Sequence, residues 1–330
     1  MQAISYQDFG AARDVLTLGE IETPEPQAGE VRVRLVYSGV NPSDVKARAG
    51  GRPGVSKPPY PRIVPHSDGA GEIDAVGAGV DPARIGQRVW IWNGQWQRAF
   101  GSAAQYITLP AVQAVRLPDQ VGFETGASLG IPGLTACHAV FGGGDVGGQT
   151  VLVQGGGGTV GYLAVQLAKW GGARVIASCS PRDHERVLSA GADAVCDHGA
   201  PDLVDRVLAA SGGRPVDQIV EVEFGRNVES DTALIAPNGR IAAYGSAREM
   251  QPVLPFYPLM FKAVTLDLLL IYLLAEAPRN AAIDRLHDAL SAGALTCPVQ
   301  ARYALADTAM AHEAVEAGSR SGAILVACQD

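Results

Sequence analysis

The sequence predicts an α/β protein in which a doubly wound parallel sheet is inserted into a mainly β domain. Three patterns support this prediction. The opening region consists of short strand-like segments separated by glycine and proline, strands and helices alternate after residue 125 or so, and the last segments resemble the opening region again. With 330 residues, the chain is long enough for two domains that each bury a hydrophobic core.

The opening region has the period-two alternation of half-buried strands. In residues 30–38, valine and leucine alternate with arginine, so that one face is apolar and the other charged. Similar segments follow at 71–77, 87–92 and 104–109. Short strands with this punctuation are typical of antiparallel, barrel-like domains.

The middle of the chain alternates between apolar strands and amphipathic helices, which favours a parallel sheet with right-handed crossovers. We expect strands at 150–154, 173–178, 193–197, 216–222 and 239–245, and helices at 161–171, 182–191, 201–211 and 227–236. A helix at about 278–292 and strand-like segments at 299–303 and 323–326 then return to the style of the opening region.

Residues 155–161 form a glycine-rich turn between the apolar run 150–154 and an amphipathic segment. A strand, a tight turn and a helix in this order form a cradle for a pyrophosphate, which meets the backbone and the N-terminus of the helix. In a chain with 40 glycines, a flexible loop is the alternative, but the flanking strand and helix favour the cradle. The expected dinucleotide contacts are Gly156, Gly157, Gly158, Thr159, Val160 and Gly161.

The next predicted strand ends at Ser178, where proteins that prefer NAD usually carry an acid for the ribose 2′-hydroxyl. Without that carboxylate, a 2′-phosphate meets no repulsion. Ser178 and Ser180 can donate hydrogen bonds to it, Arg182 can pair with it, and His198 can lie beside the adenosine end. The cofactor expected here is therefore NADPH. For Arg182, a solvated position in the first turn of the next helix is the alternative.

Charge and cysteine usage narrow the classes of function. The net charge of −8 argues against a nonspecific nucleic-acid or anionic membrane surface. The apolar stretch 263–275 is too short to span a membrane and contains Asp267. The five cysteines are scattered and the chain start has no secretion signal, so we expect reduced thiols, no structural zinc and a cytoplasmic location.

Several motifs together resemble the medium-chain dehydrogenase/reductase superfamily, and within it the zeta-crystallin-like quinone oxidoreductases. They lie at 38–46, 65–77, 85–90, 133–136, 155–161, 190–193, 239–245, 311–314 and 321–322, which spans nearly the whole chain. The resemblance implies a Rossmann domain at 125–275, inserted into a GroES-like catalytic domain made of 1–124 and 276–330.

Zinc-dependent members of that superfamily hold a catalytic metal with cysteine and histidine. This chain has Asn41 and Ser67 at those positions, and His66, one residue away, has no cysteine partner. The cysteine-rich lobe expected between Gly86 and Pro110 is also missing. The resemblance therefore implies metal-free hydride transfer to an electron-poor acceptor, namely a quinone. An enone or 2-alkenal reductase, or a non-catalytic, crystallin-like nucleotide-binding protein, is the alternative.

Asn41 and Asp44 are the candidate catalytic residues. Asn41 can position substrate or nicotinamide through its amide, or it can serve as the turn residue that precedes Pro42. Asp44 can take part in a proton relay, although capping of the following helix is favoured. Thr135 lies where similar enzymes contact nicotinamide, with a hydroxyl bonded to the helix backbone as its alternative.

Tyr244, Gly245 and Ser246 lie at the carboxyl end of a predicted parallel strand, where ligands bind in such sheets. By resemblance, Gly322 joins the cofactor contacts. The apolar segment 264–274 predicts an edge strand that pairs with a second copy, and hence a homodimer.

Overall fold

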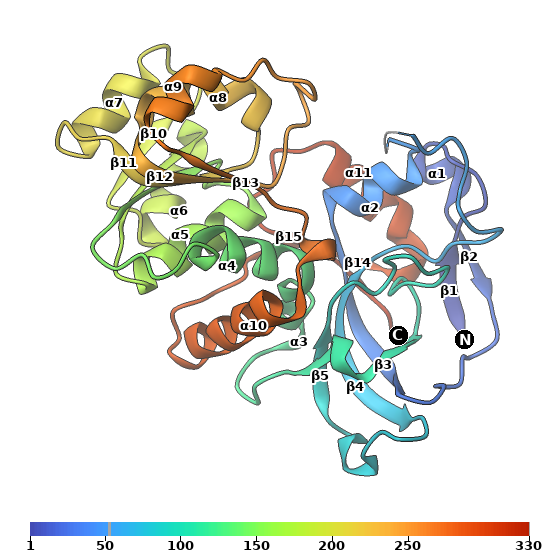
Figure 1. Ribbon diagram of the computed structural model, residues 1–330. Coiled ribbons are helices and arrows are strands. Elements are labelled where there is room, and N and C mark those ends of the chain that lie inside the picture. The colour runs from blue at the N-terminus through green and yellow to red at the C-terminus, as the bar shows by residue number, and fades with distance from the viewer. Residues whose placement is uncertain (52–53, 330) are drawn as a thin grey trace. The chain divides into compact units, whose positions relative to one another are not determined.

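The computed structural model describes residues 1–51 and 54–329 and divides into two compact units (Figure 1). The first unit contains Met1–Ile131 and Cys297–Asp330, and the second contains Pro132–Thr296. The first unit is thus assembled from both ends of the chain. Its boundaries differ from the expected ones, which were residues 124 and 276.

The boundary moves to residue 297 because helix α10 (Glu276–Ser291) packs on α4 (Leu134–Phe141) of the second unit. The Cys137 thiol donates to the Ala282 carbonyl at 3.4 Å, and the Arg285 guanidinium lies 4.5 Å from the centre of the Phe141 ring. The expectation that residues 276–292 belong to the β-rich domain is therefore corrected.

The second unit is a doubly wound parallel sheet with strand order β10–β9–β8–β11–β12–β13. In Figure 1, α4, α5 and α6 lie on one face of this sheet and α7, α8 and α9 on the other. The strands are β8 (Thr150–Gln154), β9 (Arg174–Cys179), β10 (Ala194–Asp197), β11 (Val216–Glu221), β12 (Ile235–Ala243) and β13 (Thr265–Leu268). The remaining helices are α5 (Thr159–Trp170), α6 (His184–Ser189), α7 (Leu203–Ala210), α8 (Phe224–Leu234) and α9 (Phe256–Phe261). The predicted fold class is confirmed.

The central strands hold this unit together because both of their faces are covered. Leu152, Ile176, Ile219 and Ile241, one from each of four adjacent strands, are fully buried in one cluster. Burial of one such side chain contributes about 1.5–3 kcal/mol to stability. The predicted strand at 264–274 is shorter than expected, because β13 ends at Leu268 and a 3-10 turn follows at Ile271–Leu273.

The first unit is built on a mainly antiparallel sheet of order β14–β15–β3–β4–β5–β7, with β6 also paired to β3 and β1 paired to β2. Its strands are β1 (Gln2–Ser5), β2 (Thr17–Glu20), β3 (Glu30–Val40), β4 (Asp68–Val76), β5 (Arg88–Ile91), β6 (Tyr106–Pro110), β7 (Ala114–Arg116), β14 (Val299–Ala304) and β15 (Ala323–Ala327). Its helices are α1 (Ala12–Val15), α2 (Pro42–Arg48), α3 (Phe123–Gly126) and α11 (Thr308–Glu316). Strands from both ends of the chain meet where β15 pairs with β3.

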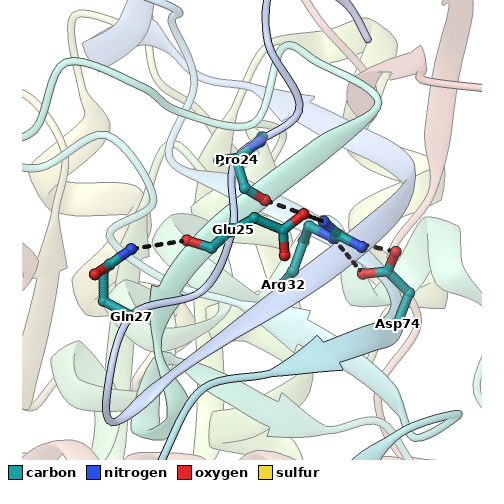
Figure 2. A network of polar contacts seen from close by, with 5 residues as sticks. All are labelled: Pro24, Glu25, Gln27, Arg32 and Asp74. Atoms are coloured by element: carbon teal, nitrogen blue, oxygen red, sulfur yellow. Dashed lines mark hydrogen bonds and ion pairs between the residues drawn. The ribbon is translucent and has the colours of Figure 1, made fainter.

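A polar network holds the loop before β3 against the sheet (Figure 2). The Arg32 guanidinium donates to Asp74 on β4 at 3.0 and 3.2 Å, to the Pro24 carbonyl at 3.2 Å and to Glu25 at 2.8 Å. Figure 2 shows these acceptors gathered around the one side chain, while Gln27 donates to the Glu25 carbonyl at 3.3 Å. The Asp74 contact raises the pKa of Arg32, so this cation stays charged.

Candidate active site

The glycine turn of the second unit has the shape that a pyrophosphate requires. Gly155 has a φ of +73°, a conformation that side chains disfavour. A Cβ on Gly161 would lie 2.2 Å from the Gly155 carbonyl oxygen, so only glycine lets α5 start this close to the turn. A Cβ on Gly157 would lie 2.9 Å from the Asp183 carboxylate. By contrast, Gly158 is exposed and a Cβ there would meet nothing closer than 3.5 Å.

Helix α5 begins directly after Gly158, with Thr159 and Val160 in its first turn. The first N–H groups of a helix have no carbonyl partner within it, and its dipole makes this end positive. The turn and the helix start therefore fit the phosphates of a dinucleotide.

The adenosine side of this turn brings together some of the expected residues. Ser180 Oγ lies 3.1 Å from His198 Nε2, and both side chains follow the carboxyl ends of neighbouring strands. Arg182 is half exposed, with its Nε 3.4 Å from Asp183 Oδ2. These groups can meet a phosphate from solvent.

Ser178 does not belong to that group. Its side chain is buried, its hydroxyl donates to Gln154 Oε1, and it accepts the Gly155 N–H at 3.3 Å. Ser178 and Gln154 are direct neighbours in the β8–β9 register, which explains the contact. The Ser178 hydroxyl therefore holds the glycine turn against β8. This internal role replaces the phosphate contact that was expected for Ser178.

A buried polar cluster lies where the strand order reverses, between the carboxyl ends of β8 and β11. Gln154 Nε2 donates to Asp231 Oδ1 at 3.1 Å, and Asn227 Nδ2 donates to Glu221 at 3.1 and 3.2 Å. Burial raises the pKa of both carboxyl groups, and the Glu221 charge raises that of Asp231 further. Ligands bind at such a reversal in open α/β sheets.

Tyr244, Gly245 and Ser246 connect the end of β12 to the start of α8. The Tyr244 N–H donates to the Glu221 carbonyl at 3.0 Å, the Phe224 N–H donates to the Gly245 carbonyl at 2.9 Å, and Ser246 Oγ accepts the Gly225 N–H at 2.9 Å. Burial raises the pKa of Tyr244, which therefore stays protonated. These three residues follow the strand as expected.

Thr135 and Gly322 lie in different units and have different surroundings. Thr135 is buried in the first turn of α4, in the second unit. Gly322 precedes β15 in the first unit, where a Cβ would lie 2.5 Å from the Pro298 carbonyl oxygen. Close approach of the backbone to β14 thus explains glycine at 322 without a ligand.

Asn41 follows β3 and is the N-cap of α2, in the first unit. Its backbone is extended (φ −112°, ψ 158°), as Pro42 requires. Asp44 Oδ2 accepts the Asn41 N–H at 2.8 Å in a capping box, so the capping role expected for Asp44 is present. Asn41 Nδ2 donates to Asp68 Oδ2 at 2.8 Å, and all three side chains are buried.

A second buried cluster joins His66 to His312 of α11. The two Nε2 atoms lie 2.8 Å apart, and His66 Nδ1 lies 2.8 Å from Ser38 Oγ, which is 2.8 Å from Ser102 Oγ. Burial lowers the pKa of both imidazoles, for His312 to about 3. Both rings are therefore neutral at pH 7, and both ring nitrogens of His66 are engaged.

Two family models match the chain. "Alcohol dehydrogenase GroES-like domain" matches residues 27–119, and "Zinc-binding dehydrogenase" matches residues 159–287. The rat quinone oxidoreductase is 31% identical over 247 residues, which cover 74% of this chain and 73% of that protein. The chain belongs to the zeta-crystallin-like quinone oxidoreductases. The human quinone oxidoreductase is 29% identical over 248 residues, with 74% and 73% coverage.

Solved structures agree with this family of medium-chain dehydrogenases/reductases. A mycobacterial protein complexed with NADPH superimposes with a TM-score of 0.86 at 29% identity, covering 99% of this chain and all (100%) of that one. A quinone oxidoreductase of Pseudomonas syringae gives a TM-score of 0.86 at 27% identity, covering 99% of both chains.

Among residues 1–51 and 54–329 of this quinone oxidoreductase family member, no three or more His, Cys, Asp or Glu side chains form a cluster that could hold a metal ion. Within the same ranges, no helix is both long and apolar enough to cross a membrane.

The sequence interpretation missed three buried carboxyl groups: Asp68 in the first unit, and Glu221 and Asp231 in the second. Glu221 ends the parallel strand β11, whereas Asp68 opens the antiparallel strand β4 and Asp231 lies in α8. A charged residue at the carboxyl end of a buried parallel strand is a candidate for a site, so a signal was available for Glu221.

Proposed function

We propose that this protein transfers a hydride from NADPH to a quinone. The observation that supports this most is the glycine turn, whose close contacts exclude side chains at Gly157 and Gly161 and leave Gly158 open to a ligand. The relatives named above include a quinone oxidoreductase and a structure complexed with NADPH. NADPH, when bound, supplies the hydride; the protein supplies orientation and hydrogen bonds.

The cofactor is assigned to residues of the second unit. The glycine turn and the start of α5 receive the pyrophosphate, and Ser180, Arg182 and His198 receive the 2′-phosphate. The nicotinamide end is assigned to Thr135 and the segment 244–246. Asp44 acts as the helix cap of α2.

The proposed reaction requires no metal. Asn41 and Ser67 occupy the positions at which zinc-dependent relatives carry ligands, and neither is a zinc ligand of the usual kinds. A quinone is already electron-poor, so hydrogen bonds to its developing oxyanion stabilise the negative charge sufficiently without a metal. The Asn41 amide is the group assigned to this task.

The acceptor is tested with a panel. NADPH oxidation is followed with 1,4-benzoquinone, 9,10-phenanthrenequinone and a 2-alkenal. We expect turnover with both quinones and a much slower reaction with the alkenal. Preferred turnover of the alkenal would identify a carbon–carbon double-bond reductase instead. If NADPH binds but none of the three is reduced, the reductase assignment is refuted.

We further propose a homodimer that forms through the β13 edge. This strand ends the sheet, and its outer side continues into exposed apolar side chains. Leu268 is 70% exposed, Leu273 66%, and Phe261 of α9 79%. A second copy of the same edge satisfies both the unpaired strand and this apolar surface.

The dimer is tested by size measurement in solution at micromolar concentration. We expect Leu268→Asp to give monomers and Val112→Asp, at an equally exposed residue in the first unit, to leave the dimer intact. A monomeric wild-type protein would refute this part of the proposal.

We also propose a cytoplasmic location for this protein, because all five cysteines are free thiols.

A further inference from the structure

Two buried carboxylates from different elements hold Asn41. Asp44 Oδ2 accepts its backbone N–H at 2.8 Å, and this contact belongs to the capping box of α2. Asp68 Oδ2 accepts its side-chain N–H at 2.8 Å, from the first residue of β4. The hydrogen bond from Asn41 to Asp68 is not part of the capping box of α2. It engages the side-chain amide of Asn41, to which the proposed function assigns a role.

The surrounding backbone is built closely around Asp68. A Cβ on Gly130 would lie 2.2 Å from Asp68 Oδ1, and a Cβ on Gly39 would lie 2.3 Å from the Ala127 carbonyl oxygen and 3.1 Å from Asp68 Cβ. Both glycines let neighbouring segments approach the carboxylate. Asp68 is fully buried, so it does not contact a substrate.

We propose that Asp68 is a positioning residue, which fixes the orientation of the Asn41 amide for reaction. A carboxylate only accepts hydrogen bonds, so Asp68 engages one of the two N–H groups of the amide nitrogen and fixes the direction of the second, which donates to the quinone oxygen. Without this contact the amide can turn over by rotation, and its donor and acceptor exchange places. This inference rests on the proposed role of Asn41 in quinone reduction.

The charges around Asp68 make its contribution sensitive to pH. Burial and the Asp44 charge raise the pKa of Asp68, while the N–H groups of Ile131 and Asn41 lower it. His66, on the same segment, is neutral and engaged with Ser38 and His312. As pH falls, protonation of Asp68 weakens an acceptor that Asn41 needs. An acidic limb in the kcat profile is therefore expected.

The test compares Asp68→Asn with Glu72→Gln, which neutralises a partly exposed carboxylate on the same strand. For D68N we expect a kcat about 10- to 100-fold lower, because removal of one oriented group costs on this order. The NADPH Kd, measured by fluorescence, should stay within about twofold, and the acidic limb should disappear. E72Q should behave as the wild type. In an Asn41→Ala background, D68N should cause no further loss, because it acts through the same amide.

An amide signal gives a readout that does not need turnover. The side-chain ¹⁵N–¹H resonances of Asn41, identified by their loss in N41A, should shift and exchange faster with solvent in D68N than in E72Q. A wild-type protein without quinone-dependent NADPH oxidation would refute the proposed function, and unchanged Asn41 resonances in D68N would refute the positioning contact.

Other outcomes also decide the proposal. It is overturned if D68N keeps kcat within twofold, or if D68N lowers kcat as much in N41A as in the wild type. Gly130→Ala displaces the carboxylate without removing it and should lower kcat as D68N does. If D68N and G130A both fail to give folded protein, Asp68 is required for the fold and the positioning role is overturned.

Discussion

Substitution by alanine at two glycines of the turn, Gly161 and Gly158, should have opposite consequences. The first should lower the stability of the protein, and the second should weaken NADPH binding. In Gly161→Ala, the new Cβ would lie 2.2 Å from the Gly155 carbonyl oxygen and 2.8 Å from its carbon, so α5 must move away from the turn. Overpacking of this kind costs about 1–3 kcal/mol. For a domain of this size, each kcal/mol lowers Tm by about 2–4 °C.

Gly158→Ala meets no such obstacle. The nearest atom is 3.5 Å from the new Cβ, and the φ of −79° suits alanine. Tm should therefore stay the same or rise slightly, since the unfolded chain loses freedom. The methyl group instead occupies the approach of the pyrophosphate. Loss of one charge-assisted hydrogen bond, worth about 1.5–3 kcal/mol, weakens NADPH binding about 10- to 100-fold.

Thermal melting without cofactor and NADPH titration by fluorescence separate the two effects. Gly147→Ala is the matched control, because its Cβ would lie 3.6 Å from the nearest atom in a turn outside the cradle. It should match the wild type in both assays. NADPH binding by G158A at wild-type affinity would refute the phosphate cradle, and wild-type melting of G161A would refute the steric argument.

Two further predictions concern cofactor choice and pH. Arg182→Ser should weaken NADPH binding about tenfold and leave NADH binding unchanged. The control Arg206→Ser, which removes an exposed cation paired with Asp202, should change the binding of neither cofactor. Equal losses for NADPH and NADH in R182S would exclude a 2′-phosphate contact. His66 and His312 stay neutral in the folded protein and take up protons only after it unfolds. The free energy of unfolding should therefore fall as pH decreases below about 6.5, by about 1.4 kcal/mol per histidine per pH unit. Urea unfolding at pH 7.5 and 5.5 measures this for the wild type and for His312→Gln. The pH slope should be smaller in H312Q, and an unchanged slope in H312Q would contradict the buried neutral pair.

Local patterns in the sequence predicted the elements that carry the cofactor. The glycine turn, its strand and its helix are contiguous, so spacing alone places them together, and β8 has the predicted bounds at Thr150–Gln154. The alternation of strand and helix predicted a parallel sheet for the same reason. The resemblance supplied the family, which the rat relative supports.

Contacts between distant segments could not be predicted in this way. Ser178 bonds to Gln154 because the two lie side by side in the β8–β9 register, and a single sequence does not reveal register. Asp68 meets Asn41 across 27 residues for the same reason. The sequence of helix α10 shows that it has an apolar face, but it does not show which unit covers that face. Its packing on α4 therefore could not be predicted.

The reaction proposed for this protein is hydride transfer from NADPH to a quinone without a metal. The most direct test is quinone-dependent NADPH oxidation by protein dialysed against a chelator, with 9,10-phenanthrenequinone as the acceptor. We predict that the chelated protein keeps the full rate and that added zinc does not increase it. Loss of the rate on chelation, with recovery on addition of zinc, would contradict the account.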